Sequence, residues 1–515
     1  MIGARKWWAL AGVQLAVLAV GLDITVLSVA LPTLATDLHA TESDLQWFSS
    51  GYTLVLAAAM LPAGLIGDRY GRKKVMLAAL ALFAAGSLAC AYAPSVGAFL
   101  AARLVLGLAG AGVVVLAMSA LVVLFDERER PRAVAVWAAA NFLSLPIGPV
   151  LGGWLLSRYW WGWIFLVNVP VALVGLAAAA ALVPESRAPQ AAGIDVTGVV
   201  LSSAGLAAVT FGLIEAGQDG WSDPRAIAWM AAGIAVLAAF LGWERRLTRR
   251  PGGQPLINLA LFRSASFTWG IVLVAVGSAA LVGVLFTMPQ YFQGVLGTSA
   301  MGSGLRLLPL IGGFVAGLVP ASGLTRLLGA KVTVAAGFAV FGAGLAIGAA
   351  TSASSGGGFA AAWLAVVGAG LGLMFATASS ASLSDLSEAE AGVASGMVQA
   401  LKSIGAPFGS AIMGSVLASG YQARLAVGGL PPAAAAAART SLFGALAAAR
   451  DLKSAALATS ARGAFVHGMD AALLVAAGIA AAGLVLTLAF LPGRSRPRER
   501  AEPAREPGGS HAITP

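Results

Sequence analysis

Cysteine, histidine and charged residues are all scarce in this sequence. Its 515 residues include one cysteine, Cys90, and three widely separated histidines, His39, His467 and His511. These numbers exclude an internal disulfide framework and leave no cluster for a cysteine- or histidine-based metal site. Only 10% of the residues are charged, less than half the share of about 25% in soluble domains. This scarcity excludes an ordinary soluble enzyme and a disordered chain.

Motifs for nucleotide hydrolysis and for hydrolase catalysis are also missing. No glycine is followed by lysine and then by serine or threonine, so the chain has no Walker A motif. Neither a GxSxG elbow nor an HExxH motif occurs. The sequence therefore supports neither ATP hydrolysis nor hydrolase chemistry, and we expect a protein that is not an enzyme.

Long apolar runs dominate what the sequence does contain. Apolar residues make up 59% of the chain, and a run of about 20 of them spans a bilayer as a helix. Because backbone polar groups in hydrocarbon must pair internally, runs this long are expected to be helical. Hydropathy therefore predicts an all-α polytopic membrane protein with fourteen transmembrane helices. The expected spans are 8–31, 47–67, 74–93, 97–124, 133–157, 161–183, 195–216, 226–243, 267–289, 303–324, 331–351, 359–382, 393–418 and 464–491.

Basic residues are distributed unevenly over the connections between these spans. With Arg5 and Lys6 inside, the cytoplasmic segments hold most of the 32 basic residues, whereas the short outer loops carry only Arg158 and Arg225. This bias is the positive-inside signal of membrane proteins. An even number of spans places both termini on one side. We therefore expect both termini in the cytoplasm, and the Ala-, Gly- and Arg-rich composition favours a bacterial plasma (inner) membrane.

The chain also looks duplicated. GLIGDRYGRKK at 64–74 and SGLTRLLGAK at 322–331 each place a glycine in a short basic turn between two long helices. Internal repeats of this kind are typical of secondary transporters. The expected parts are a six-helix bundle (1–190), an inserted helix pair (191–245), a cytoplasmic linker (246–266), a second six-helix bundle (267–492) with a long outer loop (419–463), and a disordered cytoplasmic tail (493–515).

Two charged residues lie deep inside the expected spans. Asp23 is about two-thirds of the way along the first span, where an ionised carboxylate is costly unless it is paired, hydrated or protonated. It is a candidate proton-binding group, and the alternative is a structural polar contact between helices. Arg103 lies within the fourth span and needs an anion or water because arginine keeps its proton. We predict an Asp23–Arg103 pair, and the alternative is that Arg103 extends to the outer face.

Small residues and a proline mark the fifth span, in IGPVLGGW at 147–154. Gly148, Gly152 and Gly153 allow close helix approach, and Pro149 removes one helical hydrogen bond. These residues alone predict tight packing and a bend.

Polar and aromatic side chains inside the spans are candidates for lining a substrate cavity. Each is as readily explained as a contact between two helices, and Lys402 has the further alternative of extending to the membrane surface. The candidates are Gln14, Tyr52, Trp137, Asn141, Phe286, Gln290, Phe375, Gln399 and Lys402.

Six motifs, in order along nearly the whole chain, resemble those of the major facilitator superfamily, specifically its 14-helix drug:proton antiporter branch. The loop motif at 64–74 is fairly specific alone, and the six together are very specific. They are LDITVLSVALP at 22–32, GLIGDRYGRKK at 64–74, ARLVLGLAGAG at 102–112, SLPIGPVLGG at 144–153, WGWIFLVNVP at 161–170 and PLINLALFRSASF at 255–267.

The resemblance implies two six-helix bundles that rock around a central cavity, with proton entry driving the export of amphipathic small molecules. Asp23 would carry the proton and Arg103 would be its partner. No cofactor is implied beyond the proton gradient, and the expected partners are substrate, protons and lipid, without nucleic acid, for a monomer. A cytoplasmic gate in the outward-facing state would be clamped by the gate loop, which comprises Gly64, Gly67, Asp68, Arg69, Gly71, Arg72 and Lys73. The antiporter motif, which would mark exchange rather than symport, comprises Gly148, Pro149, Gly152 and Gly153.

Two other functions stay open on the sequence. One is a dedicated exporter of a single endogenous metabolite or self-made antibiotic, and the other is a membrane sensor or scaffold without flux. The membrane interior offers one firm acid, Asp23, and up to three bases, Arg103, Arg306 and Lys402. We therefore expect neutral, anionic or weakly cationic amphiphiles as substrates rather than divalent cations.

Overall fold

The computed structural model describes residues 2–126, 129–187, 195–250, 253, 255–257, 259–352, 355–383 and 388–492. Most side chains of residues 130–146 and 388–401 also lie outside this description. A 3-10 turn, η1 (Leu261–Arg263), and a π-helical turn, η2 (Tyr291–Val295), flank the tenth α-helix. The α-helices are α1 (Ile2–Asp37), α2 (Glu42–Tyr70), α3 (Arg72–Ala91), α4 (Val96–Leu124), α5 (Arg130–Arg158), α6 (Trp163–Leu166), α7 (Asn168–Leu182), α8 (Val196–Asp219), α9 (Pro224–Arg249), α10 (Ala265–Gln290), α11 (Ala300–Arg306), α12 (Leu308–Leu328), α13 (Ala330–Gly348), α14 (Gly357–Leu383), α15 (Glu388–Arg424), α16 (Pro432–Thr440), α17 (Leu442–Asp451) and α18 (Ala455–Phe490).

Every expected span coincides with helical residues. In the described part of the chain, twelve helical segments are long and apolar enough to cross a membrane. In this set, α6 with α7, α10 with η2, and α11 with α12 each count as one segment. Helices α5 and α15, with 29 and 37 residues, cover the two remaining expected spans. The all-α membrane fold is confirmed, and fourteen crossings stay a prediction.

Prolines coincide with the breaks in two of the expected spans. α6 ends at Leu166, and Pro170 lies in the first turn of α7. α11 ends at Arg306, and Pro309 is the second residue of α12. Proline has no backbone N–H to donate, so it suits a helix start better than a helix interior. The spans 161–183 and 303–324 each consist of two helices rather than one.

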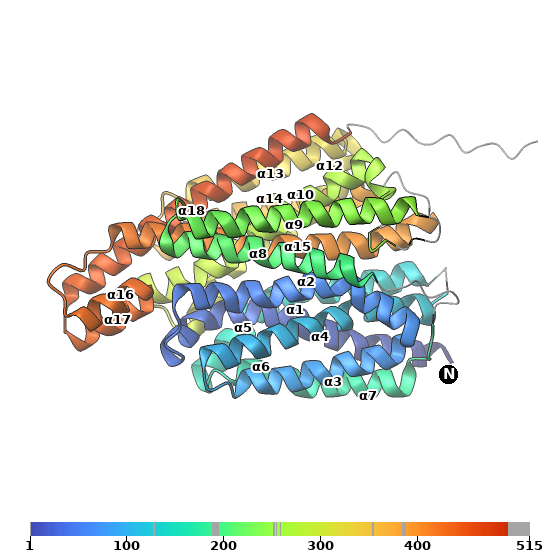
Figure 1. The fold of residues 1–515 in the computed structure, drawn as a ribbon, viewed down its shortest axis with the longest axis horizontal. Helices are drawn as coiled ribbons and strands as arrows, with labels where there is room; N and C mark the ends of the chain where they lie inside the picture. Colours follow the sequence, from blue (N-terminus) through green and yellow to red (C-terminus); the bar gives the residue numbers. More distant parts are fainter. Residues whose placement is uncertain are drawn as a thin grey trace, which may run out of the picture.

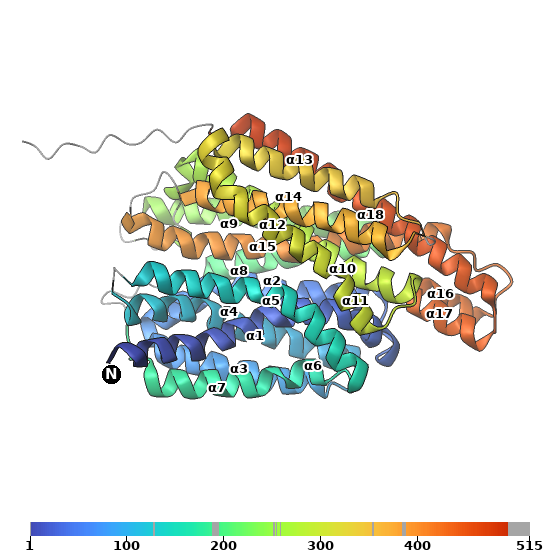
Figure 2. The same ribbon diagram turned by 180° about the vertical axis from the view of Figure 1, so that it is seen from behind.

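The helices form two bundles with a helix pair between them (Figures 1 and 2). α1–α7 form the first bundle and α10–α18 the second, each with its own hydrophobic core. α8 packs against α9 and also contacts α2 of the first bundle and α15 of the second. The Trp47 and Phe211 rings, 6.0 Å apart, mark the contact between α2 and α8. The inserted pair therefore touches both bundles.

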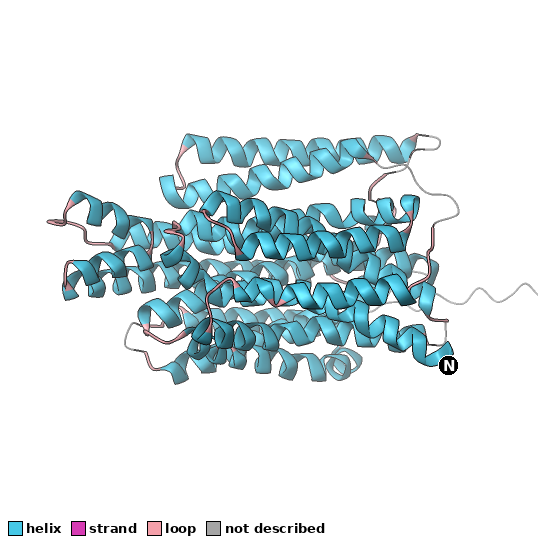
Figure 3. Cartoon of the chain, turned by 90° about the horizontal axis from the view of Figure 1, so that it is seen from below, coloured by secondary structure: helices cyan, strands magenta, loops and turns pink. Residues whose placement is uncertain are grey.

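The molecule has two distinct ends along its long axis. α1 begins and α18 finishes at one end, which we call the terminal end (Figure 1). α16 and α17 project at the opposite end, which we call the hairpin end (Figures 1 and 3). Because α15 extends to Arg424 and α18 begins at Ala455, the connection covers 425–454 and carries two helices.

The bundles interlock in the half of the molecule nearer the hairpin end. Ser50 Oγ of α2 lies 2.7 Å from Ser410 Oγ of α15, and Gln293 Nε2 donates to the Val29 carbonyl at 2.9 Å. Phe286 of α10 packs into the hydrophobic core of the first bundle. These contacts close the seam between the bundles near the hairpin end.

Two glycines occupy equivalent turns in the two bundles. Gly71, between α2 and α3, has φ 114°, and Gly329, between α12 and α13, has φ 85°. Residues with a side chain rarely adopt these angles. The shared conformation agrees with the duplication that the sequence suggests.

Candidate functional site

A buried ion pair joins α1 and α4. Arg103 Nη1 contacts Asp23 Oδ2, and both side chains are 1% exposed. Asp23 Oδ1 is buried with no hydrogen-bond partner among the described residues. The structure thus brings together the two charged groups that the sequence suggested as a pair. Because Asp23 Oδ1 accepts no hydrogen bond from the described residues, this oxygen can accept a proton.

Two further groups hold Arg103 in the interior. Its Nε donates to the Phe48 carbonyl at 3.1 Å, and its guanidinium carbon lies 4.2 Å from the centre of the Tyr52 ring. A cation over an aromatic ring contributes about 2 kcal/mol when both are removed from water. Arg103 is therefore anchored between α1 and α2 and does not extend to the membrane surface.

Glycines in α4 permit this approach of α4 to α2. A Cβ at Gly107 would lie 2.5 Å from the Tyr52 carbonyl oxygen, and a Cβ at Gly110 would lie 3.2 Å from Tyr52 Oη. A side chain at position 107 would push the two helices apart. The glycines of GLAGAG thus place α4 against the residue whose ring supports Arg103.

The glycines of the antiporter motif pack α5 beside the ion pair. A Cβ at Gly148 would lie 1.8 Å from Thr25 Oγ1, and a Cβ at Gly152 would lie 3.0 Å from Val26 Cγ1. Thr25 Oγ1 also donates to the Ser144 carbonyl of α5 at 3.1 Å. Because Thr25 and Val26 follow Asp23 closely in α1, these contacts fix α5 against the segment that carries the carboxyl group.

The same motif also contacts the second bundle. A Cβ at Gly153 would lie 2.7 Å from the Ala300 carbonyl oxygen of α11. A Cβ at Gly304 of α11 would lie 2.1 Å from the Pro149 carbonyl oxygen. Glycine on both sides of the seam lets the two backbones meet. α5 therefore connects the surroundings of Asp23 to the seam between the bundles.

The gate loop is held within the first bundle. Arg72 Nε pairs with Asp68 Oδ1 at 2.7 Å. The Lys73 N–H donates to Glu185 Oε1 at 3.2 Å, and a Cβ at Gly71 would lie 2.7 Å from the same oxygen. Glu185 follows α7, so the turn between α2 and α3 is fastened to the segment after α7.

The remaining gate-loop residues pack against their neighbours in the first bundle. A Cβ at Gly64 would lie 3.2 Å from Val115 Cγ1, and a Cβ at Gly67 would lie 2.4 Å from Leu116 Cδ2. The Arg69 guanidinium carbon lies 5.6 Å from the centre of the Tyr70 ring. α2 is thus packed tightly on α4 next to the turn.

The candidate cavity residues lie in different surroundings. Tyr52 is under Arg103, and Gln14 is buried in α1. Phe286 and Gln290 of α10 are buried at the seam. Lys402 and Phe375 lie together in the second bundle, with Nζ 5.6 Å from the ring centre. The side chains of Trp137, Asn141 and Gln399 lie outside the described residues.

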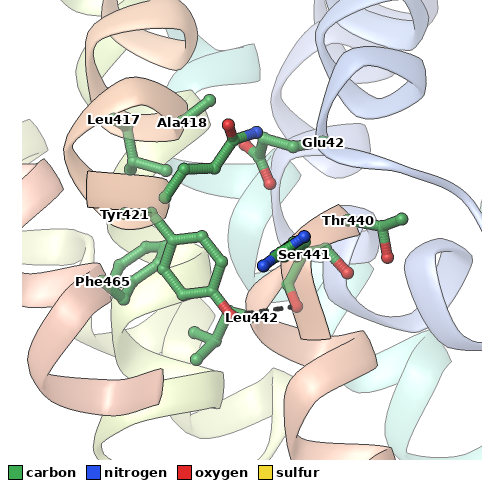
Figure 4. A pocket seen from close by; sticks show the side chains of 10 residues that line it. Glu42, Leu417, Ala418, Tyr421, Thr440, Ser441, Leu442 and Phe465 are labelled. Atoms are coloured by element: carbon green, nitrogen blue, oxygen red, sulfur yellow. Dashed lines mark hydrogen bonds between the residues drawn. The ribbon is translucent and has the colours of Figure 1, made fainter. Parts of the chain in front are cut away.

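A small pocket lies at the hairpin end (Figure 4). Glu42 of α2 faces Leu417 and Tyr421 of α15 across this pocket, and the α16–α17 hairpin closes one side. Tyr421 Oη donates to the Ala438 carbonyl at 2.8 Å, which fastens the hairpin to α15. Glu42 is only 6% exposed.

Reasoning from sequence missed Glu42 and Glu185. The sequence singles out neither of them, because both lie at or just beyond helix ends, where acidic side chains are mostly exposed. For Glu42 a signal was present, since Thr41 and Asp44 complete a capping box without it. For Glu185 no local signal exists, because its partner Lys73 is 112 residues away.

Two packed helical bundles, glycine contacts across their seam and a buried charged pair in one bundle define a polytopic membrane transporter. Residues 14–410 match the family model of the Major Facilitator Superfamily. The chain belongs to this superfamily and is a transporter rather than an enzyme.

Named relatives include exporters of antibiotics and drugs. The chain is 33% identical to the tetracenomycin C resistance and export protein of Streptomyces glaucescens, covering 81% of this chain and 76% of that protein. It is also 33% identical to the multidrug efflux pump LfrA of Mycolicibacterium smegmatis, covering 94% and 96%. The probable actinorhodin transporter of Streptomyces coelicolor is 31% identical, covering 80% and 72%.

Solved structures share the fold. A bacterial homolog of the human lysosomal transporter Spinster, in an inward-facing and unoccupied conformation, superposes with a TM-score of 0.66 at 16% identity, covering 96% of this chain and 99% of that chain. A D-xylose-proton symporter superposes with a TM-score of 0.59 at 15% identity, covering 95% and 98%. At these identities the likeness shows the fold alone.

Proposed function

We propose that the chain is a proton-coupled antiporter that exports amphipathic small molecules from a bacterial cell by alternating access. The names of its relatives support export. The observation that carries proton coupling is the buried Asp23–Arg103 pair, in which Asp23 Oδ1 has no partner among the described residues. A carboxyl group in a membrane interior binds and releases protons as its surroundings change between apolar and wet.

Protonation of Asp23 changes what Arg103 contacts. A neutral carboxyl group attracts the guanidinium less strongly than a carboxylate does. Arg103 still keeps the Phe48 carbonyl and the Tyr52 ring, so its charge stays supported while the ion pair loosens. The contact between α1 and α4 is thus stronger when Asp23 is ionised than when it is protonated. Because the glycines of α5 pack against both α1 and α11, a shift of α1 also changes the packing at the seam.

We propose that the terminal end faces the cytoplasm, as the distribution of basic residues indicates. The seam contacts near the hairpin end then close the outer face. In an outward-facing state the gate loop would meet the second bundle, and Arg72 and Lys73 would exchange their contacts with Asp68 and Glu185 for contacts across the seam.

Lys402 and its aromatic neighbours suggest the class of substrate. Lys402 Nζ lies 5.6 Å from the Phe375 ring, and the Phe375 ring lies 6.0 Å from that of Phe314. A cation on one ring of an aromatic pair suits a flat amphiphile that is neutral or carries an acidic group. We propose neutral, anionic or weakly cationic amphiphiles as substrates.

Transport by purified protein in liposomes tests the proposal. An imposed pH gradient should drive uptake of tetracenomycin C or ethidium by the wild type. Asp23→Asn should bind these compounds but fail to accumulate them in response to the gradient. Asp37→Asn, which changes an exposed acid at the end of α1, is the matched control and should transport normally. Gradient-driven accumulation by Asp23→Asn would refute Asp23 as carrier.

The breadth of resistance separates this function from a dedicated exporter of one metabolite. Expression in a susceptible bacterial host should raise resistance to several unrelated amphiphiles if the substrate range is broad, and to a single compound if the exporter is dedicated. A membrane sensor or scaffold would show no flux with any probe. We expect the monomer to suffice, without a cofactor beyond the proton gradient.

A further inference from the structure

Glu42 is a buried acid that the helix start does not require. Thr41 caps α2 by accepting a hydrogen bond from the Asp44 N–H, and the Asp44 carboxylate accepts one from the Thr41 N–H at 2.8 Å. The Glu42 carboxyl group instead turns toward the second bundle, where Gln290 Nε2 donates to its Oε1 at 3.4 Å. Among the described residues no cation lies within 4.0 Å of it, so no salt bridge offsets this burial.

Gln290 presents an unpaired acceptor next to this carboxyl group. Its Nε2 donates to Glu42 and to the Phe286 carbonyl, but its buried Oε1 has no partner among the described residues. An ionised Glu42 has no hydrogen to offer this oxygen. A protonated Glu42 has an O–H donor as well as an acceptor, so acid and amide would satisfy each other at two points.

None of the described charged or titratable groups near Glu42 forms an ion pair with it, so protonation is the way to neutralise its charge. Tyr421 of α15 faces it across the pocket (Figure 4). Arg439 of α16 lines the same pocket but is exposed and makes no ion pair with it. On the side of its own helix, Asp44 is occupied by the cap and His39 is exposed.

We propose that Glu42 is a second proton-binding residue of the transporter and must be protonated for the bundles to close at the hairpin end. The proposal rests on the proton-coupled function above and extends it, because it assigns to the outer gate a proton site separate from Asp23. When the seam is open, Glu42 is hydrated and ionised. When α10, α15 and the hairpin cover it, an ionised Glu42 would be a buried unpaired charge, so closure takes up a proton.

The sign of the effect follows from this linkage. Protons favour the closed form because that form binds one more of them, so acidification of the outer side favours closure and alkaline conditions favour opening. An antiporter gains from this arrangement, since the outward-open form would close only after a proton has arrived from outside.

Spin-label distances across the hairpin end test the proposal independently of transport. The labels sit on Thr36→Cys of α1 and Ala436→Cys of α16, two exposed positions, in protein with Cys90→Ala. All variants also carry Asp23→Asn, which removes the other proposed proton site. For one linked proton, the ratio of closed to open populations should fall up to about tenfold for each unit rise in pH.

Glu42→Gln, which mimics the protonated acid, should stay closed at every pH, whereas the matched control Asp37→Asn should keep the pH dependence. A pH-independent distance in Asp23→Asn alone, or an unchanged dependence in Glu42→Gln, would overturn the proposal. If Glu42→Gln does not fold, Gln290→Leu serves as the second test. Without the amide acceptor, the closed form with protonated Glu42 is less stable, so the pH midpoint of the closed-to-open change should move to lower pH. An unmoved midpoint would overturn the assignment. The liposome assay with Asp23→Asn reports separately on the antiport itself.

Discussion

Replacing Arg103 with methionine should destabilise the protein strongly, because it strands a buried carboxyl group. Methionine fills much of the same volume but offers no charge to Asp23, no donor to the Phe48 carbonyl and no cation to the Tyr52 ring. Removing one partner of a buried ion pair costs about 3–5 kcal/mol. We expect a loss in this range in the free energy of unfolding, measured by denaturant titration of the purified protein in detergent micelles.

A double-mutant cycle isolates the pair from the other losses. Asp23→Leu leaves an unpaired Arg103 that retains two contacts, so we expect a loss near the lower end of the same range. Asp23→Leu with Arg103→Met leaves no buried charge, and such replacements are often neutral or stabilising. The double variant should therefore be more stable than either single variant.

The control for this cycle is Tyr52→Phe. It keeps the ring beneath Arg103 and loses only a hydrogen bond of 3.4 Å to the Val20 carbonyl, so stability should change by about 1 kcal/mol or less. If Arg103→Met costs as little stability as this control, or if the losses of the two single variants simply add in the double variant, Asp23 and Arg103 do not stabilise each other as a buried pair.

Three further substitutions test the packing of α5, the turn at Gly71 and the charge of Lys402. Gly148→Val places a side chain where even a Cβ would lie 1.8 Å from Thr25 Oγ1. The rate of pH-driven transport in liposomes should therefore fall at least about tenfold, since small displacements of groups at a functional site can cause losses of this size. A near-normal rate would show that α5 need not touch α1. Gly71→Ala should lose about 1–2 kcal/mol of stability because φ is 114°, and an unchanged unfolding midpoint would contradict this strain. Lys402→Glu reverses the charge at the proposed substrate site. The measured affinity for an anionic amphiphile should fall, and that for the cation ethidium should rise. Equal changes in both affinities would argue against a charge-selective site.

The helical architecture could be predicted because hydrocarbon leaves the chain few alternatives. Apolar runs of sufficient length located all the long helices. Asp23, the one acid that the sequence places firmly inside the expected spans of the first half, pointed to Arg103. The breaks before α7 and α12 required closer attention to Pro170 and Pro309, which hydropathy averages conceal.

What could not be predicted depends on how helix ends meet. Glu185 reaches the gate loop only because α7 packs against α3, which begins at that loop. Glu42 is buried only because α10, α15 and the hairpin cover the start of α2, and these segments lie hundreds of residues away in sequence. An acid near a helix end is normally solvated. The capping box of Thr41 and Asp44 indicates only that the start of α2 does not need Glu42, and it does not reveal which segments cover Glu42.

In the proposed antiport, Asp23 gives up a proton when substrate binds. Proton release on addition of tetracenomycin C or ethidium to the purified protein, followed with a pH indicator in weak buffer, measures this directly. We expect release from the wild type and from Asp37→Asn, and no substrate-dependent release from Asp23→Asn. Equal release from wild type and Asp23→Asn would contradict this expectation.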